Sequence, residues 1–129
     1  MNDITISPKR VLLVDDEREV REAVRRMLAQ DRHVVVEANN GAEALSLFVR
    51  NQFDLVITDL ELPFLKGDEL AVRIRQLVPQ QPIMAITAYY VRSGPNSPFD
   101  LVLSKPFDAN RLRNGIASLL PEPEEAVAA

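Results

Sequence analysis

The sequence predicts an α/β protein built on a doubly wound, five-stranded parallel sheet with helices on both faces. Five short apolar runs alternate along the chain with segments in which apolar residues recur at helical spacing. Such alternation favours a parallel sheet whose right-handed crossovers place helices over both faces. Acidic, hydroxyl or basic residues follow four of these runs, at the edge where ligands bind in open α/β sheets.

The first strand and the first helix are predicted within residues 10–30. Residues 10–14 (RVLLV) form a strand that ends abruptly in Asp15-Asp16-Glu17, and residues 17–30 form an amphipathic helix. The helix dipole favours acids in the first turn, which accounts for one or two of these acids but poorly for Asp15, at the strand end. The apolar stripe of the helix contains Val20, Ala23, Val24, Met27 and Leu28.

The second strand is predicted at residues 33–37 and the second helix at residues 42–51. The turn Asn39-Asn40-Gly41 separates them. His33 is the single histidine of the chain, so a histidine-based triad or zinc site is not expected. We place it on the surface at the start of the strand and assign it no role. The inward-facing helix residues are Ala44, Leu45, Phe48 and Val49.

The third strand, residues 55–58, is apolar enough to be buried on both faces, and it ends at Asp59. An acid after a strand can also be a simple turn former, so its position alone leaves both roles open. After a loop over residues 61–67, Asp68 is predicted to be the N-cap of a third helix, which Pro79 terminates. The apolar stripe of that helix contains Leu70, Ile74, Leu77 and Val78.

The last part of the chain is predicted to contain two strands and a closing helix. Residues 83–86 form the fourth strand, which ends at Thr87, and residues 100–104 form the fifth, which ends at Lys105-Pro106. Residues 89–98 contain two prolines and a glycine without apolar periodicity. A fourth helix at this point is therefore predicted to be truncated, distorted or disordered. The closing helix spans residues 108–120, with Leu112, Ile116, Leu119 and Leu120 inward.

Length and composition indicate one domain over residues 10–120, after a flexible start at residues 1–9 and before an acidic tail or linker at residues 121–129. The chain has no cysteine, which excludes thiol catalysis and disulfides. Its net charge of −4 gives no sign of nucleic-acid binding. No apolar run approaches membrane-spanning length, and no signal-peptide pattern is present, so we expect a cytoplasmic protein without membrane contact.

The polar residues at the strand ends are predicted to converge on one rim. Asp15 and Asp16 follow the first strand, Asp59 the third, Thr87 the fourth and Lys105 the fifth. Two bare carboxylates about 4–5 Å apart repel by about 3–4 kcal/mol at an effective dielectric near 20, so the cluster needs a cation or a raised pKa. Ligands that are all oxygen favour Mg²⁺. The rim therefore suits phosphoryl transfer to an aspartate.

Some of these residues can also have purely structural roles. Thr87 can be an ordinary strand residue, and Lys105 can be a solvated surface lysine. Tyr89 and Tyr90 are interpreted as packing residues.

The sequence resembles the receiver domains of bacterial two-component response regulators over residues 10–120. The pieces that match are Val14-Asp15-Asp16, residues 54–59 (DLVITD) with Pro63 and Gly67 downstream, Ile86-Thr87-Ala88 and Lys105-Pro106-Phe107. The resemblance implies a flavodoxin-like sheet with strand order 2-1-3-4-5. It also implies a cis bond between Lys105 and Pro106.

The resemblance assigns the metal ligands and the phosphoacceptor. Asp59 would be phosphorylated by a histidine kinase or a histidine phosphotransfer protein. Asp16 would bind Mg²⁺ directly, and Asp15 mainly through water. Asp59 and the backbone carbonyl of Glu61 would complete the protein ligands.

The resemblance also assigns two residues to the phosphoryl group itself. Lys105 would contact it, and Thr87 would move to donate a hydrogen bond to it.

Two features depart from the family pattern. The interval between Thr87 and Lys105 is short, and Val102 occupies the position of the family's switch aromatic. We therefore expect the usual dimer or output face to be rebuilt, with residues 89–99 as the mobile switch.

The predicted function is a Mg²⁺-dependent phosphoacceptor that controls a downstream protein or forms a homodimer. It is not an enzyme beyond its own phosphorylation and dephosphorylation, and it is a stand-alone regulator or part of a larger one. One alternative is a pseudo-receiver, a protein-interaction module that is never phosphorylated. Another is an aspartate-nucleophile phosphohydrolase with Glu61 as general acid, which the short chain and the paired acids of the first strand fit poorly.

Overall fold

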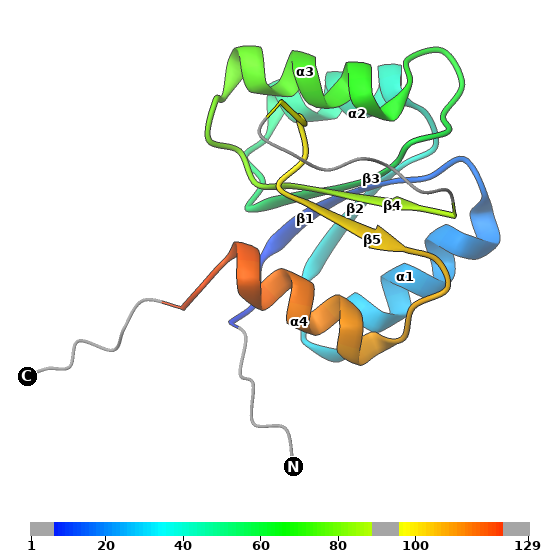
Figure 1. Cartoon of the computed structure of the whole chain (residues 1–129), viewed down its shortest axis with the longest axis vertical. Helices are drawn as coiled ribbons and strands as arrows, with labels where there is room; N and C mark the ends of the chain where they lie inside the picture. The colour runs from blue at the N-terminus through cyan, green and yellow to red at the C-terminus, as the bar shows by residue number, and fades with distance from the viewer. Residues whose placement is uncertain (1–6, 89–95, 123–129) are drawn as a thin grey trace, which may run out of the picture.

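The computed structural model describes residues 7–88 and 96–122 (Figure 1). In these ranges the elements follow one another as β1 (Arg10–Val14), α1 (Arg18–Gln30), β2 (Val34–Ala38), α2 (Gly41–Arg50), β3 (Leu55–Asp59), α3 (Gly67–Leu77), β4 (Ile83–Thr87), β5 (Leu101–Ser104) and α4 (Ala109–Leu119). The boundaries differ from the predicted ones by a residue or two at most ends, as is usual for element termini.

The five strands of the described chain form one parallel sheet in the order β2-β1-β3-β4-β5. The predicted strand order and fold class are confirmed. The register pairs Val14 with Thr58 and Asp59 with Ile86, so the residue after β1 lies level with the last residue of β3. Thr87 pairs with Ser104 at the end of β5. This register determines which side chains meet at the carboxyl edge.

Helices cover both faces of the sheet. Figure 1 shows α2 and α3 on one face and α1 and α4 on the other. All five residues of β3 are buried, and they divide between the two cores: Val56 packs on the α2–α3 side, and Leu55 and Ile57 pack on the α1–α4 side. The continuous apolar run in the sequence therefore marks a central strand, as predicted.

Several residues predicted to face inward are exposed instead. Val49 is 59% exposed, Leu77 54% and Val78 42%. Each lies in the last turn of α2 or α3 or just beyond it. Ala23 on α1 is also exposed. The helical period placed Ala44, Phe48, Leu70 and Ile74 correctly in the core, but the predicted stripes were wider than the covered face of each helix.

Asp68 was predicted to be the N-cap of α3, and this prediction is wrong. The helix begins at Gly67, so Lys66 is the N-cap and Asp68 lies in the first turn. The carboxylate of Glu69 accepts a hydrogen bond from the Lys66 N–H at 3.4 Å. Glycine suits this first helical position because the backbone approaches closely: a Cβ on Gly67 would lie 2.2 Å from the carbonyl oxygen of Asp59, so any other residue requires the backbone to shift.

His33 is buried rather than on the surface, with 7% of its area exposed. Its Nδ1 accepts a hydrogen bond from the backbone N–H of Lys9 at 2.9 Å. Burial lowers the pKa of His33, which keeps the ring neutral and able to accept this bond. The prediction was wrong because it ignored the segment before β1, which covers the start of β2.

The predicted truncation of the fourth helix falls mainly on residues 89–95, which lie outside the described residues, as does most of the proposed switch segment. Residues 96–100, the described end of the β4–β5 connection, contain no helix. Phe99 within them is 9% exposed and packs into the core on the α2–α3 side. No helix in the described part of the chain is long and apolar enough to cross a membrane.

Candidate functional site

Residues from four strand ends meet at the carboxyl edge of the sheet. Asp15 follows β1, Asp59 is the last residue of β3, Thr87 is the last of β4 and Lys105 follows β5. Asp15 is 0% exposed, Asp59 5% and Thr87 1%. The rim predicted from the sequence therefore exists, and most of its polar side chains are removed from bulk water.

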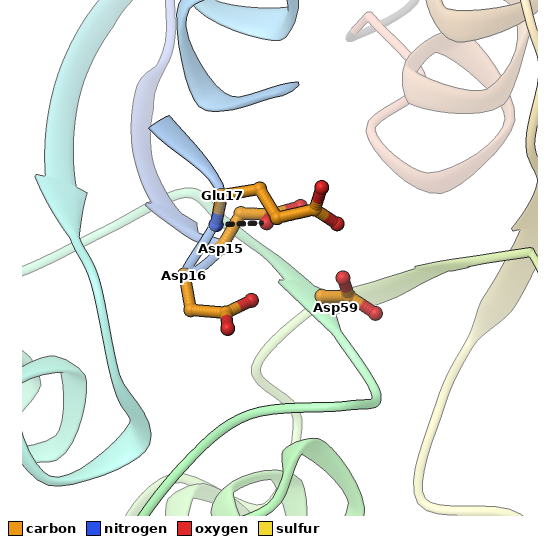
Figure 2. Close-up of side chains that lie close together, drawn as sticks. All are labelled: Asp15, Asp16, Glu17 and Asp59. Carbon is orange, nitrogen blue, oxygen red and sulfur yellow. Dashed lines mark hydrogen bonds between the residues drawn. The ribbon is translucent and has the colours of Figure 1, made fainter. Parts of the chain in front are cut away.

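Four carboxylates gather at this edge, as Figure 2 shows. Asp15, Asp16, Glu17 and Asp59 each offer an oxygen, and these oxygens all lie within 4.8 Å of one another. Sequence reasoning assigned Glu17 to the helix dipole and did not place it in the cluster. The run of three consecutive acids was the available signal. Glu61 is not one of these four residues. It contacts the cluster through its backbone, because its N–H donates to Oδ1 of Asp59 at 3.2 Å.

Asp15 is held at several points. Its N–H donates to the carbonyl of Ala38 at 3.2 Å, its Oδ1 accepts from the N–H of Glu17 at 2.8 Å, and its carbonyl accepts from Arg21 at 2.8 Å. Its Oδ2 is buried and has no hydrogen-bond partner among the described residues. Burial raises the pKa of Asp15 to about 6, although the Glu17 N–H and the Lys105 ammonium act in the opposite direction.

Lys105 supplies the positive charge of the site. Its Nζ lies 3.2 Å from Oδ2 of Asp59 and 3.5 Å from Oδ2 of Asp15. Burial lowers the pKa of Lys105, but the two carboxylates outweigh burial and raise it above its ordinary value. The backbone also fixes the residue, because its N–H donates to the carbonyl of Thr87 at 2.8 Å. The Lys105–Pro106 bond is cis, as predicted.

The charges of the cluster do not balance. Four carboxylates face one ammonium group, and neighbouring carboxylates at this spacing repel by about 3–4 kcal/mol per pair at an effective dielectric near 20. The donor atoms are all oxygen, and one of them, Oδ2 of Asp15, is a buried acceptor without a described donor. These residues therefore fit a hard divalent cation such as Mg²⁺.

The site opens to solvent through a hollow of about 270 Å³ lined by Asp16, Glu17, Asp59, Glu61, Ala88 and Lys105. A larger cavity, of about 560 Å³, lies at the amino edge of the sheet, where Phe48, Phe53 and Leu77 contribute to its walls. The carboxylate cluster and its lysine lie at the smaller hollow, so we assign the chemistry to that one.

The family model described as the response regulator receiver domain matches residues 11–117. The response regulator protein PilR of Pseudomonas aeruginosa is 38% identical over 130 residues, which cover 94% of this chain and 29% of PilR. The response regulator MprA of Mycobacterium leprae is 36% identical over 123 residues, 91% of this chain and 54% of MprA. The chain thus spans about half or less of the length of these relatives.

Solved structures give the same result. The response regulator TrrA of Thermotoga maritima in complex with Mg²⁺–BeF is 35% identical, with a TM-score of 0.81 over 87% of this chain and 99% of TrrA. A CheY-like receiver domain protein of Methanospirillum hungatei is 27% identical, with a TM-score of 0.82 over 90% of this chain and 96% of that one. The family match, the strand order and the rim agree, and this chain belongs to the response regulator receiver domain family.

Proposed function

We propose that this receiver domain takes a phosphoryl group onto Asp59 in two-component signal transduction. The observation that carries the proposal is the place of the Asp59 carboxylate. It is 5% exposed, lies within the acidic cluster and has Lys105 Nζ at 3.2 Å from Oδ2. Aspartate is an established nucleophile for phosphoryl groups, and this one also borders the hollow that opens to solvent.

The transfer can be written with the groups of this rim. A carboxylate oxygen of Asp59 bonds to the phosphorus of a phosphohistidine as the phosphorus–nitrogen bond breaks, and the imidazole leaves neutral when its second nitrogen carries a proton. The ammonium of Lys105 stabilises charge on the transferred oxygens. The hydroxyl of Thr87, at the end of the neighbouring strand, donates a hydrogen bond to one of them.

Asp15, Asp16, Asp59 and the backbone carbonyl of Glu61 would hold Mg²⁺ at this rim. The buried Oδ2 of Asp15, which has no hydrogen-bond partner among the described residues and only the Lys105 ion pair at 3.5 Å, and the all-oxygen donor set support this assignment. When bound, the ion neutralises charge on the phosphoryl group. The chain's own groups then supply the nucleophile, the ammonium and the hydroxyl. The related TrrA structure contains Mg²⁺–BeF.

The proposed phosphoryl donor is a histidine kinase or a histidine phosphotransfer protein. TrrA, 35% identical to this chain, has also been solved in complex with the histidine kinase ThkA. We place the protein in the cytoplasm, without nucleic-acid or membrane binding by this chain. Its activity is limited to its own phosphorylation and dephosphorylation, and its output is a downstream protein or a homodimer.

A never-phosphorylated pseudo-receiver remains the second candidate, because Val102 replaces the switch aromatic. Val102 is half-buried against the core on the α2–α3 side. This substitution affects the readout of phosphorylation rather than the phosphorylation itself, because the acids, the threonine and the lysine of the rim are all present.

Mass spectrometry after incubation with acetyl phosphate and Mg²⁺ tests the proposal. The wild-type chain should gain one phosphoryl group, and the folded Asp59→Asn variant should gain none. Absence of phosphorylation in the wild type, together with absence of Mg²⁺ binding, would support the pseudo-receiver. Sustained turnover of a phosphate ester would indicate a phosphohydrolase instead.

A further inference from the structure

Arg21 on α1 connects the ends of two neighbouring strands at the acidic rim. One of its terminal nitrogens donates to the backbone carbonyl of Asp15 at 2.8 Å. Its Nε donates to Oε1 of Glu37, near the end of β2, at 2.9 Å. The Arg21 side chain is 17% exposed, so most of it is enclosed. The phosphoryl chemistry proposed above uses neither Arg21 nor Glu37.

The contact with Asp15 completes the restraint of that residue. The Asp15 N–H is held by Ala38 and Oδ1 is held by the Glu17 N–H, so the Arg21 bond fixes the remaining backbone group. Only Oδ2 keeps no hydrogen-bond partner in the described chain, and it faces Lys105 at 3.5 Å. Arg21 therefore restrains the turn over residues 15–17, which carries three of the four carboxylates of the cluster.

Glu37 in turn orients the guanidinium. Its Oε1 accepts from Arg21, and Nε of Arg25 lies 3.5 Å from its other oxygen. A guanidinium is a planar fork with donors in fixed directions, so a carboxylate on one edge determines where the other donors point. A lysine ammonium at this position could not hold both acceptors in the same geometry.

We propose that Arg21, oriented by Glu37, is a positioning residue for the metal-binding turn of this receiver domain. It touches neither the phosphoryl group nor the ion, and it acts by holding Asp15 and Asp16 in the arrangement that the ion requires. The inference rests on the proposed function. Groups that orient metal ligands from outside typically change metal affinity about 10–100-fold, and we expect roughly tenfold here.

The first test compares Arg21→Gln and Glu37→Gln with two control variants. Arg18→Gln removes an exposed arginine of the same helix that pairs only with Glu22 among the described residues. Arg25→Gln removes the other arginine near Glu37, which has no described contact with Asp15. Phosphorylation by acetyl phosphate is followed against Mg²⁺ concentration. Arg21→Gln should raise the half-saturating concentration roughly tenfold and leave the maximal rate little changed, and Arg21→Lys should rescue it only in part.

A metal-free measurement separates this inference from the proposed function. In chelator, amide exchange at Glu17 reports the bond between its N–H and Asp15 Oδ1. Arg21→Gln should speed this exchange but leave the core of β3 protected, and calorimetric titration with Mg²⁺ should show weaker binding even if Asp59 accepts no phosphoryl group. Unchanged Mg²⁺ affinity would overturn the inference, whether or not exchange at Glu17 changes. Loss of protection throughout the sheet would also overturn it, because it would assign Arg21 to the fold alone.

Discussion

The ammonium of Lys105 lies between the carboxylates of Asp59, at 3.2 Å, and Asp15, at 3.5 Å. These residues come from the ends of three different strands, and Lys105 is 46 positions from Asp59 in the chain. Both carboxylates are almost fully buried, whereas the lysine side chain is 20% exposed. One partly exposed cation thus offsets two carboxylates that water reaches poorly, and the stability of the metal-free domain depends on it.

Replacement of Lys105 by Met should destabilise the metal-free domain at pH 7. The substitution leaves Asp15 and Asp59 without their cation, and we expect a loss of about 1–3 kcal/mol in the free energy of unfolding. The loss should shrink near pH 5, where Asp15 is protonated in the native state. Urea unfolding in chelator measures both values. Lys66→Met is the control, because Lys66 is exposed and has no ion pair in the described part of the chain. Equal stability of Lys105→Met and wild type at pH 7 would contradict the prediction.

Asp15 should make the metal-free domain less stable as the pH rises from about 4 to about 6. Burial raises its pKa in the folded state to about 6, above its ordinary value of 3.8, so the native state binds the proton more tightly. The resulting stability is complete below the unfolded pKa and is lost as the pH rises through the folded pKa, by about 2–3 kcal/mol. Unfolding of wild type and Asp15→Asn in chelator at each pH measures the difference.

The wild type must be compared with Asp15→Asn because His33 also makes the stability of the domain depend on pH. Burial lowers the pKa of His33, so its contribution to stability is lost as the pH falls below the unfolded value of 6.5, the opposite direction. Both proteins contain His33, so its contribution cancels in the difference between them. A constant difference in unfolding free energy from pH 4 to pH 7 would show that the environment of Asp15 does not favour its protonated form.

Much of the architecture follows from patterns that the sequence displays directly. Residues 55–58 are apolar or β-branched without interruption, which favours a strand covered on both faces, and the register then brings Asp59 level with Asp15. The strand-end residues could be predicted to converge because parallel strands share one carboxyl edge. That inference requires no knowledge of side-chain conformations.

Other features depend on tertiary contacts that no local pattern encodes. Arg21 and Glu37 look like ordinary surface charges, and their bond spans 16 positions. The membership of Glu17 in the acidic cluster depends on the conformation of the turn over residues 15–17. The burial of His33 depends on the path of the chain at Lys9. The exposure of Leu77, the last residue of α3, depends on how much of that helix the rest of the fold covers.

Gly67→Ala should disturb the loop that follows the phosphoacceptor. A Cβ at this position would lie 2.2 Å from the carbonyl oxygen of Asp59 and 2.9 Å from Cα of Leu60, and backbone atoms cannot move aside cheaply. We expect a loss of about 1–3 kcal/mol in unfolding free energy, with slower phosphorylation of Asp59. Urea unfolding and the acetyl phosphate assay measure the two effects.

Gly115→Ala in α4 is the matched control for this substitution. Its Cβ would meet only the ends of flexible side chains, at 2.9 Å from Leu101 and 3.1 Å from Met84. The gain in helix propensity, about 1 kcal/mol, offsets the crowding, so stability should change little. If both variants had the same stability, the backbone contact of Gly67 would not be what makes glycine necessary there.

Arg75 on α3 should hold residues 96–100, the described end of the β4–β5 connection, in place without affecting the acidic rim. Its guanidinium donates to the carbonyls of Pro98, at 2.8 Å, and Gln81, at 3.1 Å, and to the carboxylate of Asp100 at 2.7 Å. Asp100 also accepts from the N–H of Ile83 at 2.8 Å. One side chain thus joins α3 to the starts of β4 and β5, at the amino edge of the sheet.

Arg75→Met should therefore lower the free energy of unfolding by about 2–3 kcal/mol, because several partly buried acceptors lose their donor. Amide exchange should become faster at Ile83 and Phe99, whereas Glu17 at the opposite edge should keep its protection. Phosphorylation of the folded protein should proceed at the wild-type rate. Arg73→Met on the same helix is the control, because Arg73 is exposed and has no ion pair among residues 7–88 and 96–122. Faster exchange at Glu17 in Arg75→Met would show that the two edges of the sheet are coupled, against this prediction.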